Sequence, residues 1–315
     1  MKIVVLDKNS LGNDTPLEGL KKFGDVDVYD STDNSEIFDR VSDCDVIIIN
    51  KVKITDQVLA AAKKLRLICV FATGYDNIDI VAAQKRGVAV CNVPGYSTDS
   101  VALFTVANVL ALYTHLREYN DYVRSGAYTE SGIPNKLVPV YHEISGKTWG
   151  IIGLGNIGMA VAKVAEALGA NVIANKRTPI DAYKGVDIDT LCRESDIITI
   201  HCPLNDDSRG LINKERISMM KKDVVIVNEA RGAVVNDGDI VEALKNGKIA
   251  AFGSDVYTKE PFDCDHPFYE IRDFSNVLFT PHAAWGSYEA RVRCIGIICD
   301  NISSFLNGEM RNRVV

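Results

Sequence analysis

The stretch WGIIGLGNIGMAVAKVAEAL, residues 149–168, decides the fold class of this chain. An apolar run, Trp149–Ile152, leads into a glycine-rich turn, and a helical pattern, Met159–Leu168, follows directly. In such a turn the glycines permit a tight path, a close approach to a pyrophosphate and close packing of helix on strand. Three glycines can also simply shape a βα turn, but this context favours a dinucleotide site. We expect the cofactor at Gly153, Gly155, Asn156, Ile157 and Gly158.

Short apolar runs alternate with helix-period stretches on both sides of this turn. The first series of runs is Ile3–Leu6, Val46–Ile49, Leu67–Phe71 and Val88–Val93, and helical patterns such as Asp56–Lys64 and Ile78–Arg86 separate them. The second series continues through Val172–Ala174, Ile197–Ile200, Val224–Val227, Ala250–Ser254 and Val277–Thr280. Parallel strands that are buried on both faces are continuously apolar, as these runs are. The sequence therefore predicts an α/β fold with two doubly wound parallel sheets.

One long apolar helix is predicted between the two series, over Val101–Tyr122. It is too apolar to lie in open water, so we expect it to lie between the domains and also to meet a partner subunit. The segment Arg124–Ser145 is irregular and predicts an arm or loop. A homodimer is the expected assembly, because a symmetric dimer is the commonest solution.

The composition excludes several classes of protein. With 35 basic and 42 acidic residues among 315, the net charge is −7, and no dense Lys/Arg run exists that would bind nucleic acid. No apolar run approaches the roughly 20 residues that span a bilayer. The eight cysteines are spread out without a C-x-x-C pair, so we expect reduced thiols, no metal site and a cytoplasmic location. The N-terminus, Met1–Asp7, predicts a first strand rather than a signal peptide.

The residues after the run Val172–Ala174 bear on the choice of cofactor. An NAD-specific site normally has a carboxylate there, which binds the adenosine ribose. This chain has Lys176, Arg177 and Thr178 instead, a set that can bind a 2′-phosphate. NADP(H) is therefore favoured, and NAD(H) stays possible if the two cations are only solvated loop charges.

Three further side chains follow strands of the second series, where open α/β sheets place their ligands. Arg231 can hold a substrate carboxylate and polarise a neighbouring carbonyl, although by itself it is as well explained as a surface arginine. Glu260 and His282 can form a carboxylate–imidazole pair. Such a pair favours the imidazolium, which protonates a carbonyl oxygen in one direction, while the imidazole removes that proton in the other.

These features together resemble the D-isomer-specific 2-hydroxyacid dehydrogenases over nearly the whole chain. The N-terminal half carries similar motifs at Ala72–Asp79 and Cys91–Tyr96. The C-terminal half carries them, in the family's order, at His201–Leu204, Asn228–Gly232, Asp255–Pro261 and Thr280–Trp285. Asn50-Lys51-Val52 and the ending Gly308–Asn312 are most similar to the glycerate dehydrogenase and hydroxypyruvate reductase branch.

The resemblance implies a role for each site residue. Arg231 would bind the substrate, Glu260 would pair with His282, and His282 would be the acid/base that exchanges a proton with a 2-keto or 2-hydroxy acid. Substrate contacts are implied at Thr73 and Gly74, and we add Lys51 and Tyr75, although packing or exposure explains each of these two better than a substrate contact does. Cofactor contacts are implied at Asp255, Cys202, Pro203, Ala230 and His282.

The resemblance also implies a discontinuous, flavodoxin-like substrate-binding domain, residues 1–98 with 288–315, and a Rossmann domain, residues 99–287, with the active-site cleft between them. The tail Tyr288–Leu306 predicts a helix that returns to the first domain. The chain departs from the family pattern at Leu103, where a polar residue is usual, and after the second nucleotide strand.

Two other functions remain open from sequence. A formate or phosphite dehydrogenase shares this pattern, although formate dehydrogenases resemble it with Gln at the position of Glu260. A nucleotide-sensing corepressor also shares the fold, and fold alone does not exclude that role. The leading prediction is a small 2-keto acid substrate such as hydroxypyruvate or glyoxylate.

Overall fold

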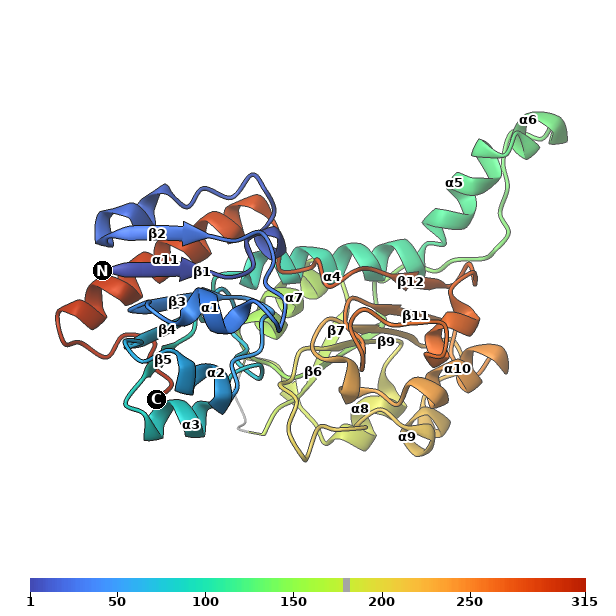
Figure 1. The fold of residues 1–315 in the computed structure, drawn as a ribbon. Coiled ribbons are helices and arrows are strands. Elements are labelled where there is room, and N and C mark those ends of the chain that lie inside the picture. The colour runs from blue at the N-terminus through green and yellow to red at the C-terminus, as the bar shows by residue number, and fades with distance from the viewer. Residues whose placement is uncertain (178–181) are drawn as a thin grey trace. The chain divides into compact units, whose positions relative to one another are not determined.

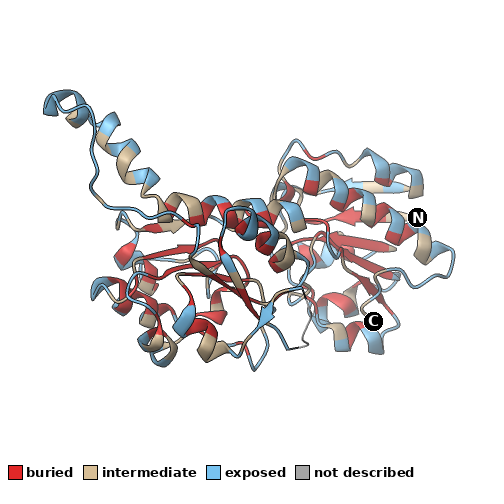
Figure 2. Cartoon of the chain, turned by 180° about the vertical axis from the view of Figure 1, so that it is seen from behind, coloured by how far each residue is buried: buried red, intermediate tan, exposed pale blue. Residues whose placement is uncertain are grey.

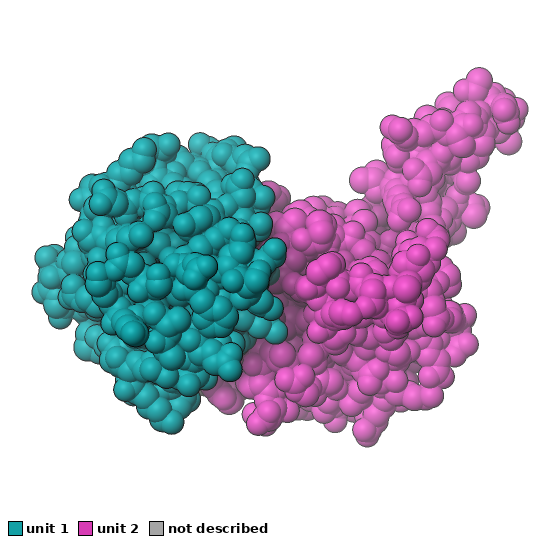
Figure 3. All heavy atoms as spheres, viewed as in Figure 1, with its two compact units in different colours: residues 1–97, 286–315 teal, residues 98–285 magenta. Residues whose placement is uncertain are grey.

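The computed structural model describes residues 1–177 and 182–315, and the chain divides into two compact units (Figure 3). The first unit comprises Met1–Ser97 and Gly286–Val315, and the second comprises Thr98–Trp285. The chain therefore leaves the first unit once and returns to it at the end. The substrate-binding role of the first unit stays a prediction.

The first unit, all of whose residues are described, is built on a five-stranded parallel sheet in the order β2-β1-β3-β4-β5 (Figure 1). This is the flavodoxin-like order that was predicted. The strands are β1 (Lys2–Val5), β2 (Asp25–Val28), β3 (Val46–Ile49), β4 (Leu67–Val70) and β5 (Ala89–Cys91). The helices are α1 (Ile37–Val41), α2 (Asp56–Ala61), α3 (Ile80–Lys85) and α11 (Tyr288–Leu306), besides short 3-10 helices at Lys8–Leu11 and Glu18–Phe23.

Burial explains which strands of this sheet could be predicted. β3 and β4 are buried at every residue, which is why each looks like a continuous apolar run. The edge strand β2 is mostly exposed and carries two aspartates, so its pattern gave no apolar run and it was missed. The tail helix was predicted correctly, since α11 has the expected bounds and packs against β4.

In the described part of the second unit, seven parallel strands form a sheet in the order β12-β11-β10-β9-β6-β7-β8. The order is that of a Rossmann sheet with one further strand at its edge, so the predicted fold class is confirmed. The strands are β6 (Thr148–Ile152), β7 (Asn171–Asn175), β8 (Lys184–Gly185), β9 (Ile197–Ile200), β10 (Val225–Asn228), β11 (Ala251–Ser254) and β12 (Val277–Phe279). The helices are α4 (Thr98–Tyr113), α5 (Leu116–Arg124), α6 (Ala127–Ser131), α7 (Asn156–Ala167), α8 (Ile188–Glu194), α9 (Lys214–Met219) and α10 (Asp237–Lys245), with 3-10 turns at Gly232–Val234 and Pro267–Ile271. The two-residue strand β8 is too short and polar to be seen in the sequence.

The core of the second unit lies on both faces of its sheet. On one face α4 and α7 pack together over β6, where Trp149 is fully buried. On the other face α8, α9 and α10 cover a core that includes Phe252 and Phe268. Figure 2 shows the central strands of both units as buried ribbons with exposed residues on the outer faces of the helices.

The prediction of one long helix over Val101–Tyr122 was wrong. The chain bends by 64° between α4 and α5, because His115 has a φ of 52° and a residue in this left-handed region cannot continue a right-handed helix. The His115 ring is held by the Glu118 carboxylate at 2.9 Å. Beyond the bend, α5 has no buried residue, and α5 and α6 project away from the rest of the second unit as an arm (Figures 1 and 2).

No single helix in residues 1–177 and 182–315 combines the length and the apolar character needed to cross a membrane, and α4 with α5 passes that test only as a bent pair. The eight cysteines all lie in described segments and are free thiols.

Candidate active site

The glycine turn after β6 has the geometry that a pyrophosphate needs. Gly153 has a φ of 91°, and a Cβ there would lie 2.5 Å from the Cys202 main-chain nitrogen, so only glycine fits. At Gly158 a Cβ would lie 2.3 Å from the Gly153 oxygen. At Gly155, which precedes the first turn of α7, a Cβ would meet nothing within 4 Å. This position is therefore open, and the helix N-terminus offers its free N–H groups there, so these residues fit a dinucleotide phosphate.

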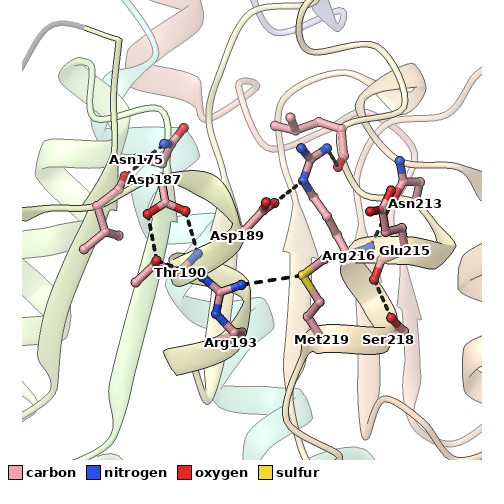
Figure 4. Close-up of polar contacts among 12 residues, drawn as sticks. Asn175, Asp187, Asp189, Thr190, Arg193, Asn213, Glu215, Arg216, Ser218 and Met219 are labelled. Carbon is pink, nitrogen blue, oxygen red and sulfur yellow. Dashed lines mark hydrogen bonds and ion pairs between the residues drawn. The ribbon is translucent and has the colours of Figure 1, made fainter.

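The end of β7 carries the residues that were expected to select the cofactor. Lys176 and Arg177 are both exposed directly after this strand, while Thr178 lies outside the described residues. The Asn175 side chain at the strand's end donates to the Val186 carbonyl oxygen at 3.0 Å. This bond ties the chain before α8 back to β7, as Figure 4 shows on its left side.

Helices α8 and α9 pack against each other and are joined by hydrogen bonds. Asp187 caps α8 by accepting from Thr190, and Arg216 on α9 donates to Asp189 on α8 at 3.0 Å (Figure 4). The guanidinium of Arg216 also donates to the Leu211 carbonyl oxygen. Charge-assisted hydrogen bonds thus hold α8 and α9 together.

Cys202 and Pro203 follow β9 and lie beside the glycine turn. Burial raises the pKa of the Cys202 thiol to about 11, so it stays protonated and acts as a packing group. The Pro203 carbonyl oxygen accepts from Ser208. His201, at the end of the same strand, has both ring nitrogens buried without a hydrogen-bond partner in the described segments, and burial lowers its pKa to about 3. His201 is therefore a neutral ring and is not a proton donor.

Arg231 lies in a turn at the end of β10 that the Asn228 side chain holds. The Asn228 amide donates to the Arg231 carbonyl oxygen at 3.0 Å and its oxygen accepts from the Ala230 N–H at 3.1 Å. One guanidinium nitrogen of Arg231 donates to the Ala230 carbonyl oxygen. A Cβ on Gly232 would lie 2.0 Å from the Tyr257 carbonyl carbon. Glycine is therefore needed next to Arg231, because the chain from β11 passes directly over it.

His282 and Glu260 form a direct pair. His282 Nδ1 lies 2.6 Å from Glu260 Oε2, and about a quarter to a third of each side chain is exposed. The other oxygen, Glu260 Oε1, accepts from the Tyr257 N–H at 3.1 Å. The carboxylate is thus fixed from two sides, and it fixes the ring with Nδ1 toward Glu260. With Nδ1 toward Glu260, proton exchange with a substrate would take place at Nε2.

Asp255 holds the turn in which His282 lies. Its carboxylate is buried and accepts from the Thr280 hydroxyl at 2.7 Å, the Ala283 N–H at 2.8 Å and the Ala284 N–H at 2.9 Å. His282 itself has a φ of 52°, a conformation that needs such support. Asp255 was predicted only as a cofactor contact. This second role was missed because the donors lie on a turn 25 to 29 residues away in the sequence.

Glu229, which the sequence analysis did not select, is buried next to these groups. Its Oε1 accepts from the Asn108 side chain of α4 at 2.6 Å, and its Oε2 is buried without a partner in the described segments. Burial, and then the neighbouring charge of Asp255, raise the pKa of Glu229 to about 8, so the carboxyl is neutral at pH 7. One signal was present, since Asn108 is a polar residue within an otherwise apolar helical pattern.

The structure places the described predicted site residues of the second unit after six of its strands. These strands are β6, β7, β9, β10, β11 and β12. Of the predicted catalytic residues it brings Glu260 and His282 into direct contact. Lys51, Thr73, Gly74 and Tyr75 lie after β3 and β4 of the first unit. Within the described residues no group of three or more His, Cys, Asp or Glu side chains is arranged to hold a metal ion.

A Rossmann sheet with an open glycine turn and a carboxylate-held histidine defines a nicotinamide-dependent oxidoreductase. Residues 106–284 match the model of the D-isomer specific 2-hydroxyacid dehydrogenase NAD binding domain. The chain belongs to the D-isomer-specific 2-hydroxyacid dehydrogenase family. It is an oxidoreductase of the CH–OH group that interconverts 2-keto and 2-hydroxy acids with a nicotinamide cofactor.

Similar proteins cover the whole chain. A hydroxypyruvate reductase of Blautia hydrogenotrophica is 37% identical over 100% of this chain and 99% of its own length. A glycerate dehydrogenase of Methylorubrum extorquens is 35% identical over 99% of this chain and 98% of its own length. Among solved structures, the D-lactate dehydrogenase of Aquifex aeolicus, complexed with NAD and lactic acid, has a TM-score of 0.87 and 27% identity, covering 99% of this chain and 97% of that one. An acyclic imino acid reductase in complex with NADPH and D-Arg has a TM-score of 0.88 and 30% identity over 100% of both chains.

Proposed function

We propose that this enzyme reduces a small 2-keto acid to the 2-hydroxy acid: hydroxypyruvate to glycerate with the D configuration at C2, or glyoxylate to the achiral glycolate. The observation that carries the proposal is the contact between His282 Nδ1 and Glu260 Oε2 at 2.6 Å. The similarity to a hydroxypyruvate reductase, a glyoxylate reductase and a glycerate dehydrogenase supports the choice of substrate.

The chain's own residues supply binding and the proton. The reduced nicotinamide, when bound, supplies the hydride that the substrate C2 receives. Arg231 holds the substrate carboxylate through two parallel N–H···O bonds and polarises the carbonyl. His282 donates its Nε2 proton to the carbonyl oxygen as C2 is reduced, and Glu260 stabilises the imidazolium before that transfer. In the reverse direction the neutral imidazole removes the hydroxyl proton.

The test is the absorbance of the reduced nicotinamide, followed with hydroxypyruvate, glyoxylate, pyruvate and phenylpyruvate in separate assays. We expect the enzyme to oxidise the cofactor faster with hydroxypyruvate or glyoxylate than with pyruvate or phenylpyruvate. Tight binding of the cofactor without turnover of any acid would contradict the proposal and favour a nucleotide sensor.

NADPH is proposed to be preferred over NADH, because Lys176 and Arg177 replace the usual carboxylate after β7. Changing both to alanine should weaken NADPH binding about tenfold, or about 1.4 kcal/mol, and should change NADH binding by less than about twofold. Dissociation constants from fluorescence titration measure both effects.

A matched control for this pair is Lys221→Ala with Lys222→Ala, which removes two adjacent exposed cations elsewhere on the second unit. It should leave the ratio of the two dissociation constants unchanged. Equal weakening of NADPH and NADH by the Lys176 and Arg177 changes would refute the proposed 2′-phosphate contact.

A homodimer that uses the arm is also proposed. Leu116 and Val123 on α5 are 60% and 56% exposed, and exposed apolar side chains continue through residues 133–141. A projecting helix with no buried residue gains stability when its apolar side chains meet a second copy. Leu116→Ser with Val123→Ser should therefore shift the mass in sedimentation velocity from dimer toward monomer.

The comparison for the arm is Phe38→Ser with Val81→Ser, which replaces two exposed apolar residues of the first unit. This variant should keep the mass of the dimer. An unchanged dimer in the arm variant would show that α5 does not carry the interface.

A further inference from the structure

The carboxyl end of the first sheet carries a buried aspartate that the mechanism above does not use. Asp7 follows β1 and is only 6% exposed. Its carboxylate accepts three main-chain N–H groups of the loop after β3. Asn50 N lies 2.9 and 3.1 Å from the two oxygens, Lys51 N lies 2.5 Å from Oδ2, and Val52 N lies 3.2 Å from it.

These three N–H groups partly compensate for the burial of the Asp7 carboxyl group. Burial raises the pKa of Asp7, and the hydrogen bonds from the loop act in the opposite direction. The main-chain N–H groups of Asn50, Lys51 and Val52 lie beyond the end of β3, outside the hydrogen bonding of the sheet. Without an acceptor, each would lose its hydrogen bond to water when it is buried. One carboxylate satisfies all of them with charge-assisted bonds, so the loop is held in one main-chain conformation.

The same loop is held from its carbonyl side by Asn77. The Asn77 amide nitrogen donates to the Asn50 oxygen at 3.1 Å and to the Val52 oxygen at 2.7 Å. Asn77 lies after β4, in the loop that contains Thr73, Gly74 and Tyr75. The loops after β3 and β4 are therefore tied together by a side chain that bridges two carbonyl groups.

The loop after β4 is in turn tied to the end of β5. The Thr73 hydroxyl donates to the Val93 oxygen at 2.9 Å, and the Asn92 amide donates to the Thr73 oxygen at 2.8 Å. The Asn92 oxygen accepts from Asn301 on α11 at 3.0 Å. A continuous series of side-chain to main-chain hydrogen bonds thus runs across the ends of four neighbouring strands, from Asp7 at β1 to Asn92 at β5.

We propose that Asp7 is a positioning residue for substrate binding, which fixes the loop Asn50–Val52 and through it Lys51, with Asn77 as the opposite half of the clamp. The inference rests on the proposed function, since the substrate it serves is an anionic 2-keto acid. The ammonium of Lys51 suits such an anion, and a cation on a fixed main chain binds it with less loss of conformational entropy. Asp7 itself acts through the loop and exchanges no proton with the substrate.

The test is Asp7→Asn, compared with Asp45→Asn. Asp45 accepts a main-chain N–H from Lys2 at 2.7 Å, so it is a similar carboxylate at the opposite end of the same two strands. We expect Asp7→Asn to raise KM for the 2-keto acid about tenfold while kcat changes by less than about threefold. Asp45→Asn should leave KM unchanged, and neither variant should alter the dissociation constant of the cofactor. Asn77→Ala, which removes the other half of the clamp, should raise KM in the same way.

A double-mutant cycle with Lys51→Ala distinguishes positioning from general destabilisation. If Asp7 acts through Lys51, the change Asp7→Asn should add less than about twofold to KM when Lys51 is already alanine. The proposal would be overturned if the effects of Asp7→Asn and Lys51→Ala on KM multiplied in the double variant. It would also be overturned if Asp7→Asn and Asp45→Asn had the same KM.

Amide hydrogen exchange tests the clamp without turnover. Exchange at Asn50, Lys51 and Val52 should become faster in Asp7→Asn and stay unchanged in Asp45→Asn. If the wild-type enzyme reduces no 2-keto acid but this exchange pattern is found, the proposed function fails and the clamp stands. If exchange at these amides is the same in both variants, the clamp itself is refuted.

Discussion

Replacing His282 with asparagine is expected to lower kcat for 2-keto acid reduction about a thousandfold, because asparagine cannot donate a proton to the carbonyl oxygen of the substrate. Asparagine is chosen because it tolerates a positive φ, and His282 has a φ of 52°. The dissociation constant of the cofactor should stay within about twofold of wild type, because the glycine turn and Asp255 are untouched. Steady-state absorbance of the reduced nicotinamide at saturating substrate measures kcat, and fluorescence titration measures the dissociation constant of the cofactor.

The second unit offers a closely matched control in His115. This histidine also has a φ of 52° and also pairs with a glutamate, Glu118, at 2.9 Å, but it lies in the bend between α4 and α5. His115→Asn therefore removes the same kind of pair at the same kind of backbone conformation. It should leave kcat unchanged. A comparable fall in both variants, or no fall in His282→Asn, would remove His282 from the mechanism.

The second large effect is expected for Arg231→Gln, which should lower kcat/KM for the 2-keto acid by about a thousandfold. The guanidinium fork is proposed to hold the carboxylate and to polarise the carbonyl, and the neutral amide does neither well. Arg231→Lys keeps the charge but loses the planar fork, so it should recover only a small part of the activity. Steady-state kinetics with hydroxypyruvate and glyoxylate give these ratios.

Arg209→Gln serves as the comparison for Arg231, because it removes one exposed positive charge from a neighbouring part of the same unit. It should leave kcat/KM within about threefold of wild type. If Arg231→Lys retains full activity, the charge alone suffices and the bidentate clamp is wrong.

Much of the fold could be predicted because it depends on local patterns. The run Trp149–Ile152 and the glycines after it predict a strand that ends in a tight turn. The structure shows why glycine is needed there, because a Cβ on Gly153 would collide with the main chain of Cys202. Strands β3 and β9 were found with their correct ends because they are buried on both faces. Arg231, Glu260 and His282 were predicted as site residues because they follow such strands, where parallel sheets bind their ligands.

The features that were missed depend on contacts between residues far apart in the sequence, or lack an apolar pattern of their own. Nothing in the apolar pattern of residues 101–122 indicates that His115 takes a left-handed conformation and ends α4. The edge strand β2 lacks the burial that makes a strand apolar. The clamp of Asp7 on the loop after β3 joins residues 43 to 45 positions apart, so it has no spacing that a sequence motif would show.

The sequence by itself determined the family, the two parallel sheets and the glycine turn, and it predicted Arg231, Glu260 and His282 as catalytic residues. It did so because each depends on a residue type at a fixed distance from a strand end. Only the tertiary structure decided which carboxylates hold which loops: Asp255 on the turn around His282, and Asp7 on the loop of Lys51. The physical reason is that a buried carboxylate is satisfied by whichever donors the fold brings to it, and here most of those donors are main-chain N–H groups, which every residue but proline has.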